Sequence, residues 1–466
     1  MSSFLATSSR RLRHALGIDR AVGFTVLARS WSILGGLVNI LLIARFLTPT
    51  EQGYYYTFAS LIALQTVFEL GFSFVILQLA AHETAQLQIS PQGDISGSDV
   101  ARSRLASILQ KALRWYSVAA VLMVAGLLVT GLYFFSVHKN AGEPVAWKLP
   151  WICVALATAF TFQMDPVFSF IEGCGFVSDV AHLRFRQAVT GSVLAWSAFL
   201  LHHGLFAPAG LISGQAAAGV VFLFSRRRLL LPLLRLHTRI HNISWTREIW
   251  PFQWRMAVSF LCAYFILPLF NPVLFAYRGA REAGRMGMTT TIATALGTVA
   301  YSWVYTKVSP FGNMVARREY AALDKLFFKA VRQSTGLLFV ADALVLLLLW
   351  MVDIRFPGLA GRVLPIPLVA VILATSLLLH LYFCEAVYLR AHKKEPFLIV
   401  SVLVASLMAA STLLGGRYWG STAISIGYLL WSGFFQLALG TYIFLKRRRE
   451  WHAQDHDLAW RDSYPA

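Results

Sequence analysis

Long apolar stretches recur along the whole chain and are separated by short polar connections. Each stretch is roughly twenty residues long, the length an α-helix needs to cross the hydrocarbon core of a bilayer. None alternates polar and apolar residues as a transmembrane β-strand would. The pattern predicts an all-α polytopic membrane protein with twelve spans, near residues 22–44, 54–80, 115–137, 149–171, 183–201, 204–224, 252–276, 286–308, 333–353, 363–388, 397–415 and 420–445.

The composition supports this class. Hydrophobic residues make up 57% of the chain and charged residues only 14%, which excludes an ordinary soluble protein. The four cysteines are far apart and lack the spacing of a disulfide framework or a zinc site. There is no P-loop, GxSxG or HExxH motif. We therefore expect a protein that is not an enzyme and that uses no cofactor or metal.

Positive charge is distributed unevenly along the predicted topology. The net charge is +19, and 31 of the 41 Lys and Arg residues lie in segments on the side of the N-terminus. By the positive-inside rule, this predicts that both termini are cytoplasmic. The basic runs at 226–228 and 446–449 then serve as topology determinants that meet anionic lipid headgroups, and no nucleic-acid partner is expected.

The long basic connection in the middle divides the chain into two similar halves. We predict a cytoplasmic N-terminal segment, an N-lobe of six spans, a basic cytoplasmic linker, a C-lobe of six spans and a cytoplasmic tail that is unstructured beyond Trp451. Their bounds are 1–21, 22–224, 225–251, 252–445 and 446–466. The motif Glu51-x-Gly53 recurs as Glu282-x-Gly284, which favours a duplicated unit with parallel repeats.

Polar residues inside the first lobe are the main candidates for a site. A charge at membrane depth costs roughly 2.5–3.5 kcal/mol, so it usually faces a cavity or a partner. Span one carries Arg29 and Asn39 on one helical face, and span two carries Gln65 and Glu69 on one face. In span four, Asp165 precedes a proline, which can leave a backbone carbonyl unpaired.

The rise per residue of an α-helix predicts that three of these charged residues lie at a similar depth in the membrane. Arg29 is about 12 Å from the cytoplasmic end of its span, and Glu69 and Asp165 are about 8 Å from the same end. We expect a cluster that lines a central cavity, or alternatively a structural salt bridge that locks three helices. An arginine suits phosphate because its planar fork binds two oxygens at once. In the second lobe, Asp342 is a candidate proton or cation site, or a helix-packing residue.

Several stretches resemble a known family. They are ARFLTPTEQGYY at 44–55, ELGF at 69–72, EGCG at 172–175 and YLRAHK at 388–393. In them the chain resembles the polysaccharide-transport, or Wzx-type, flippases of the multidrug/oligosaccharidyl-lipid/polysaccharide (MOP) exporter superfamily. The resemblance implies a MATE-like, V-shaped pair of six-helix lobes around a cavity that opens alternately to the two sides of the membrane.

The resemblance also implies a function. The expected substrate is an undecaprenyl-pyrophosphate-linked oligosaccharide, moved across the bacterial inner membrane for export of O-antigen, capsule or exopolysaccharide. Arg29 is the position we assign to the pyrophosphate. The implied partners are this lipid-linked glycan, membrane lipids, H⁺ or Na⁺ as coupling ion, and a glycan polymerase or other export machinery.

Three other functions stay open. A drug/cation antiporter of the same superfamily should favour acidic cavity residues without a buried arginine, so Arg29 counts against it. A membrane-embedded glycan polymerase should have a sizeable outer loop, and the predicted outer loops are short. A non-transporting scaffold of an export complex is the third alternative.

Overall fold

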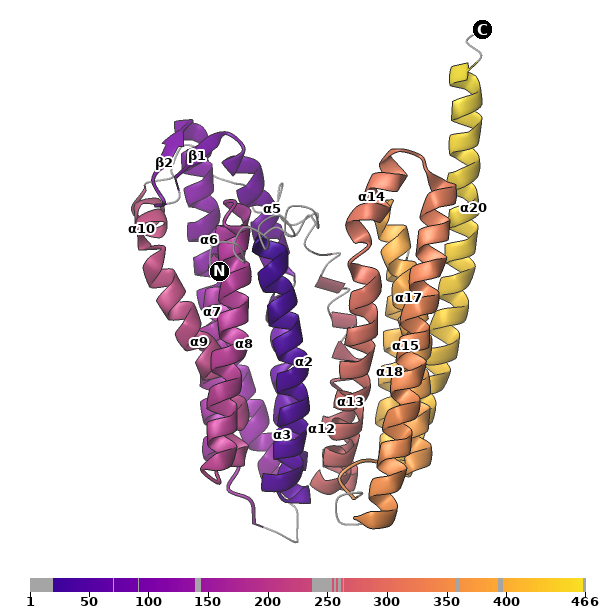
Figure 1. Cartoon of the computed structure of the whole chain (residues 1–466). Coiled ribbons are helices and arrows are strands. Elements are labelled where there is room, and N and C mark those ends of the chain that lie inside the picture. Colours follow the sequence, from indigo (N-terminus) through magenta and orange to yellow (C-terminus); the bar gives the residue numbers. More distant parts are fainter. Residues whose placement is uncertain are drawn as a thin grey trace, which may run out of the picture. The chain divides into compact units, whose positions relative to one another are not determined.

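The computed structural model describes residues 20–463, with gaps at 70, 91, 139–143, 237–253, 255–256, 259–260, 263, 357–360 and 393–396. The chain divides into two compact units, which we describe separately (Figure 1). Unit 1 comprises Met1–Thr48 and Leu61–Leu261, and unit 2 comprises Pro49–Ser60 and Cys262–Ala466.

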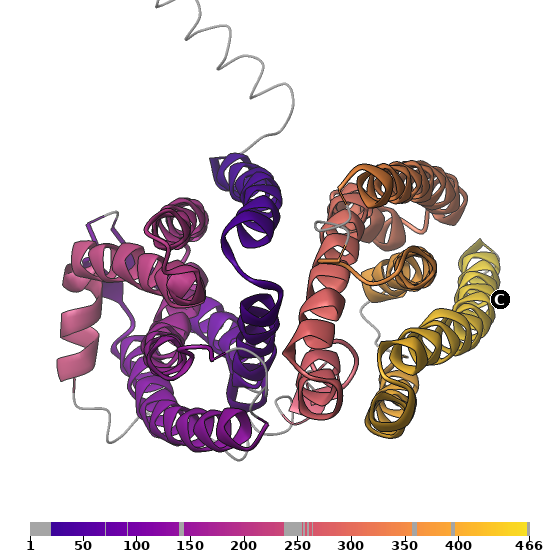
Figure 2. The same ribbon diagram turned by 90° about the horizontal axis from the view of Figure 1, so that it is seen from below.

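Unit 1 is a bundle of long helices. They are α2 (Arg20–Phe46), α4 (Gln65–Glu69), α5 (Phe72–Thr84), α6 (Asp99–Val137), α7 (Lys148–Gly173), α8 (Val177–Leu200), η1 (Gly204–Phe206), α9 (Ala207–Ser225) and α10 (Arg227–Arg235). Helix α8 packs against both α2 and α9, while α7 packs against α5, α6 and α9. The end-on view in Figure 2 shows the helices of unit 1 side by side as a bundle.

A short β-hairpin follows α5 in unit 1. Strand β1 (Leu87–Ile89) pairs antiparallel with β2 (Ile95–Gly97). Helix α6 then begins with Ser98 as its N-cap, whose hydroxyl accepts a hydrogen bond from the Ala101 amide. The sequence pattern does not predict this hairpin, because each strand has only three residues.

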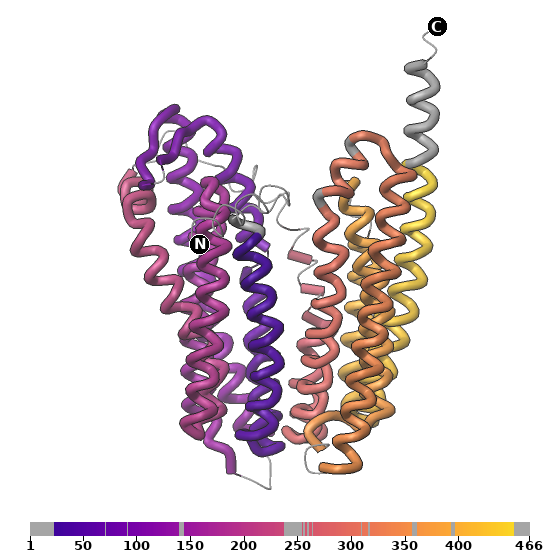
Figure 3. The backbone as a smooth tube through the Cα atoms, in the orientation of Figure 1, coloured from indigo at the N-terminus to yellow at the C-terminus, as the bar shows by residue number. Residues whose placement is uncertain are grey.

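Unit 2 is also helical. Its elements are α3 (Pro49–Ile62), which continues into unit 1, and α12 (Phe270–Arg278), α13 (Ala280–Tyr305), α14 (Val308–Ala316), α15 (Tyr320–Arg355), α17 (Ile366–Ala391), α18 (Leu398–Trp419), α19 (Ser421–Gly427), the π-helical η3 (Tyr428–Phe435) and α20 (Gln436–Ser463). Its aromatic core includes Phe311, Phe327, Tyr388 and Phe444. Figure 3 traces α15, α17 and α20 as neighbours around this core.

The all-α polytopic membrane fold is confirmed. Within the described residues, eight helices are long and apolar enough to cross a membrane, and a ninth span results if the bent pair 49–69 and 72–84 is counted as one. Helices α8 and α13 are long as well, with 24 and 26 residues, but they are more polar. The predicted span at 252–276 lies partly outside the described residues, so the count of twelve stays a prediction.

Two details differ from the sequence-based expectations. Residues 49–60 group with unit 2, although the predicted N-lobe, 22–224, includes them. The tail is helical as far as Ser463, so the expectation of an unstructured segment beyond Trp451 is wrong. The tail has no glycine, and its first proline is Pro465, so nothing local ends the helix earlier. The lobe bounds themselves stay a prediction.

Candidate functional site

The polar site of unit 1 begins at a break between two helices. Helix α4 ends at Glu69, and α5 starts after Gly71, whose φ of 69° is the left-handed conformation that favours glycine. The break places the Glu69 carboxylate near the Ser73 hydroxyl in the first turn of α5. The Ser73 hydroxyl in turn lies 3.0 Å from the hydroxyl of Tyr116, which α6 contributes and which is fully buried.

An ion pair between α7 and α8 forms the centre of the site. Arg184 Nη1 lies 3.5 Å from Asp165 Oδ1, and the side chains of Arg184 and Asp165 are 48% and 39% exposed. Helix α7 continues through Pro166, which follows Asp165 and has no amide hydrogen to donate within the helix. A half-exposed ion pair of this kind is accessible to a ligand, whereas a fully buried ion pair would only hold the two helices together.

Further groups surround this pair. Arg184 Nη1 donates to Gln187 Oε1 at 3.2 Å, and its guanidinium lies 5.5 Å from the centre of the Phe168 ring. Glu69 interacts electrostatically with both Asp165 and Arg184, and Glu172, two turns beyond Asp165, interacts with Arg184. The Arg184 guanidinium is therefore paired with one carboxylate and interacts at longer range with two more, on α4 and α7. We call these residues, Glu69, Asp165, Glu172, Arg184 and Gln187, the α7–α8 cluster.

The structure brings two of the predicted site residues together. Glu69 and Asp165 approach each other within the α7–α8 cluster. Gln65 is half-buried on α4, and Asn39 is half-buried on α2, about two turns before the end of that helix. Their roles in a site stay predictions.

Arg29 lies on α2 at the height of this cluster. The rings of Phe24 and His182 stack 4.4 Å apart, and Trp31 Nε1 donates to the Ala188 carbonyl at 3.2 Å. These contacts show that α2 and α8 run parallel, so Arg29 stands level with Gln187. Its side chain is exposed. The predicted common layer thus extends across α2, although the cation that pairs with Asp165 is Arg184.

The sequence pattern does not mark Arg184 as a site residue. Arg184 is the second residue of the predicted fifth span, 183–201, and so counts among the positive charges at its cytoplasmic end. In the structure α8 begins at Val177, so Arg184 lies two turns inside the helix. The sequence does show that Arg184 and Asp165 carry opposite charges. It does not show that spans four and five pack against each other at these positions.

Unit 2 holds the remaining candidate, Asp342. It is 7% exposed on α15, and within the described part of the chain its Oδ1 has no hydrogen-bond partner. Two turns earlier on the same helix, Ser334 Oγ lies 2.8 Å from His380 Nε2 on α17. A buried carboxyl group with an unpartnered oxygen is a candidate to hold a proton or a cation.

Comparison with known proteins defines the class to which this fold belongs. No protein-family model matches the chain, and no curated protein matches it in sequence. Among solved structures, it is similar to a multidrug resistance MATE family transporter of the MOP superfamily in its inward-facing conformation, with a TM-score of 0.61 and 12% identity over 89% of this chain and 98% of that one. The outward-facing conformation of such a transporter matches with a TM-score of 0.58 and 14% identity over 93% and 96%.

A third similar structure is a MOP superfamily transporter from Pyrococcus furiosus, with a TM-score of 0.52 and 12% identity over 91% of this chain and 94% of that one. Its description states that the reverse polarity of its binding pocket suggests a different function. The chain thus has the fold of MOP superfamily transporters along almost its whole length. At these identities the likeness establishes the fold alone.

Proposed function

We propose that this protein is a transporter that moves an undecaprenyl-pyrophosphate-linked oligosaccharide from the cytoplasmic to the outer leaflet of the bacterial inner membrane. Transport would proceed by alternating access, without catalysis, and would serve surface polysaccharide or lipopolysaccharide export. The observation that carries the proposal is the half-exposed guanidinium of Arg184 within a polar cluster of unit 1. The fold of MOP superfamily transporters supports the transport mechanism.

The guanidinium of Arg184 has capacity for a further anion. A guanidinium has five N–H donors in a planar fork, and within the described residues the hydrogen bonds of Arg184 all use Nη1. A diphosphate presents several oxygens with the spacing that such a fork binds bidentately. The Asp165 contact at 3.5 Å is long for a hydrogen bond, so an incoming phosphate would compete with it on favourable terms.

Arg29 is the second cation that we assign to the pyrophosphate. It stands on α2 at the height of Gln187 and is exposed. Two arginines at one height match the charge of a diphosphate, which carries more than one negative charge. Asp342, buried in unit 2, is our candidate for coupling transport to H⁺ or Na⁺. A glycan polymerase or other export machinery is the expected partner, with both termini in the cytoplasm.

A drug/cation antiporter is the second candidate function. The observation in its favour is the excess of acidic groups in the α7–α8 cluster, where Glu69, Asp165 and Glu172 surround one arginine. An organic cation would displace Arg184 from Asp165 and take its place among the carboxylates. The similar MATE structures are described as multidrug resistance transporters, which is a statement about those proteins.

The test is glycan export in a deletion strain, with lipid-linked oligosaccharide measured in each leaflet. We expect the deletion to trap the glycan lipid in the cytoplasmic leaflet, wild type to restore export, and Arg29→Ala to fail while still inserting in the membrane. Arg45→Ala is the matched control, since Arg45 is an exposed arginine at the other end of the same helix. Unchanged surface glycan in the deletion strain would refute the flippase, and resistance to cationic drugs would then be measured.

A further inference from the structure

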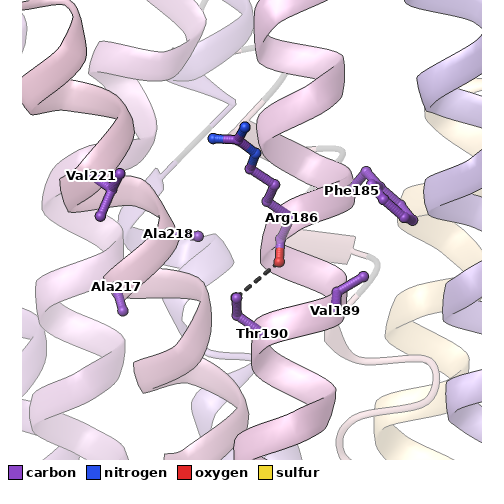
Figure 4. A pocket seen from close by; sticks show the side chains of 7 residues that line it. All are labelled: Phe185, Arg186, Val189, Thr190, Ala217, Ala218 and Val221. Carbon is purple, nitrogen blue, oxygen red and sulfur yellow. Dashed lines mark hydrogen bonds between the residues drawn. The ribbon is translucent and has the colours of Figure 1, made fainter.

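A surface groove lies between α8 and α9, on a different side of α8 from the α7–α8 cluster. It has a volume of about 370 Å³ and is lined mainly by Phe185, Val189, Ala217, Ala218 and Val221, with Arg186 at one end (Figure 4). The two helices are closest where glycines meet: a Cβ added to Gly214 would lie 2.5 Å from the Thr190 carbonyl oxygen. Beyond this contact the small side chains of Ala217 and Ala218 leave the space open.

The groove opens on an apolar face. On α9, Val221 is 63% exposed and Phe224 is 67% exposed, and on α8 Val193 and Leu194 are also exposed. Large apolar side chains at these positions of a membrane-spanning helix are suited to contact with acyl chains. The environment of the groove is therefore that of lipid, and a polar solute or a peptide would be a poor occupant.

Among the described residues that line this groove, Arg186 alone is charged. It is two positions from Arg184, so the two side chains leave α8 about 200° apart. Arg184 is directed at Asp165 and Gln187, whereas Arg186 reaches toward the α9 residues of the groove (Figure 4). Within the described part of the chain, its guanidinium makes no hydrogen bond and no ion pair, and its side chain is exposed.

The depth of Arg186 matches a lipid headgroup. The ion pair between Asp179 and Arg226 joins the start of α8 to the end of α9 and marks the polar boundary of both helices. Arg186 is seven residues further along α8, roughly 10 Å along the helix axis. A long arginine side chain at this depth extends back toward the headgroup layer, as charged side chains in membranes commonly do.

We propose that this groove is a binding site for one anionic phospholipid, whose phosphate pairs with Arg186 and whose acyl chain lies against Val189, Ala217 and Val221. The positive charge of Arg186 favours an anionic headgroup, and the apolar lining of the groove favours contact with an acyl chain. The lipid would come from the leaflet on the Asp179–Arg226 side, which the charge asymmetry predicts to be cytoplasmic. This site is separate from the proposed substrate site, and its existence does not depend on what the protein transports.

The test is native mass spectrometry of the purified full-length protein with added dioleoylphosphatidylglycerol or dioleoylphosphatidylcholine. We expect wild type to retain one phosphatidylglycerol about tenfold more tightly than phosphatidylcholine, the preference typical of one charge-assisted contact. Arg186→Gln should remove this preference, and Arg186→Lys should keep most of it. Ala217→Phe should weaken retention of both lipids because it fills the groove.

The matched control is Arg332→Gln, which removes an exposed arginine from α15 in unit 2 and should behave as wild type. If Arg186→Gln and Arg332→Gln lose the preference for phosphatidylglycerol equally, the proposed site is refuted. The preference would then depend on the overall positive charge of the protein and not on Arg186. Stronger retention of undecaprenyl phosphate than of phosphatidylglycerol would overturn the phospholipid assignment. If Arg186→Gln does not fold, Arg186→Lys and Ala217→Phe still decide between these outcomes.

Discussion

Gly53 and Gly284, 231 residues apart in the chain, lie with their backbones in direct contact in unit 2. A Cβ added to Gly284 would be 2.8 Å from the Gly53 nitrogen, and one added to Gly53 would be 1.9 Å from the Ala280 carbonyl oxygen. Both glycines end a Glu-x-Gly motif that the sequence repeats. The repeated glycine therefore has a physical reason, since only a residue without a side chain allows the start of α3 to lie this close to α13.

The close contact predicts the effect of adding one methyl group. Gly53→Ala should destabilise the protein by about 1–3 kcal/mol, because the backbone of α3 must move away from Ala280. Gly36→Ala is the control: a Cβ there would meet nothing within 4 Å, and alanine favours the helix by up to about 1 kcal/mol. Thermal unfolding in detergent measures both. Equal melting temperatures for the two variants would contradict the contact.

Gln52 adds hydrogen bonds at the same place. Its side-chain amide donates to the Gly284 carbonyl at 2.9 Å and to the Arg362 carbonyl at 2.8 Å, and the residue is 1% exposed. Gln52→Ala removes both of these buried hydrogen bonds and should cost about 1–3 kcal/mol. Gln52→Glu should cost at least as much, since an ionised carboxylate cannot donate to a carbonyl.

The control for Gln52 is Gln88→Ala in strand β1, where the side chain is exposed. Its stability should stay within about 0.5 kcal/mol of wild type, as for most surface substitutions. Guanidinium-induced unfolding followed by tryptophan fluorescence would compare the three variants. A Gln52→Glu protein as stable as wild type would show that the two carbonyl contacts contribute little.

The middle of α20 forms an ion pair with α15 within unit 2. Asp324 on α15 accepts a hydrogen bond from the Tyr388 hydroxyl at 2.7 Å and pairs bidentately with Arg448, whose Nε lies 3.0 Å from Oδ1. A double-mutant cycle of Asp324→Ala and Arg448→Ala should give a coupling free energy of about 1–3 kcal/mol. Arg448→Lys should not keep this coupling free energy, because the ammonium group of lysine cannot form the two parallel hydrogen bonds of the planar guanidinium.

A neighbouring ion pair is the control for this cycle. Arg447 and Glu450 are three residues apart on α20, 2.8 Å from each other and well exposed. Their coupling should be about 0.5 kcal/mol or less, as in other exposed pairs on one helix. Similar coupling in the two cycles would mean that Asp324 does not hold α20 in place.

The α7–α8 cluster predicts a difference between two transport variants. Arg184→Gln should lower glycan export by about tenfold or more, because a charge-assisted contact to phosphate is lost. Arg184→Lys should recover only part of the activity. Asp165→Asn should slow export with normal expression if the cluster contacts substrate. Reduced expression with normal export per molecule would instead identify the pair as a structural bridge, and immunoblotting of membranes separates these results.

Part of this cluster could be predicted from the sequence. Glu69 and Asp165 are isolated charges in apolar stretches, the helix rise predicts a similar depth for both, and in the structure the two carboxylates interact electrostatically. Arg184 could not be found in this way. A count of positive charges treats every arginine near a span end alike, and only the packing of α7 against α8 shows that this one pairs with Asp165 while Arg186 faces a groove.

The sequence by itself determined the class of protein, because the length and apolarity of a membrane span are local properties that each segment carries alone. It also determined the depth of each charge along its own helix. The tertiary structure decided which helix faces pack together, and hence the partner of each charge. It also placed residues 49–60 in unit 2, where Gly53 meets Gly284. Such contacts join positions hundreds of residues apart, and apolar periodicity carries no information about them.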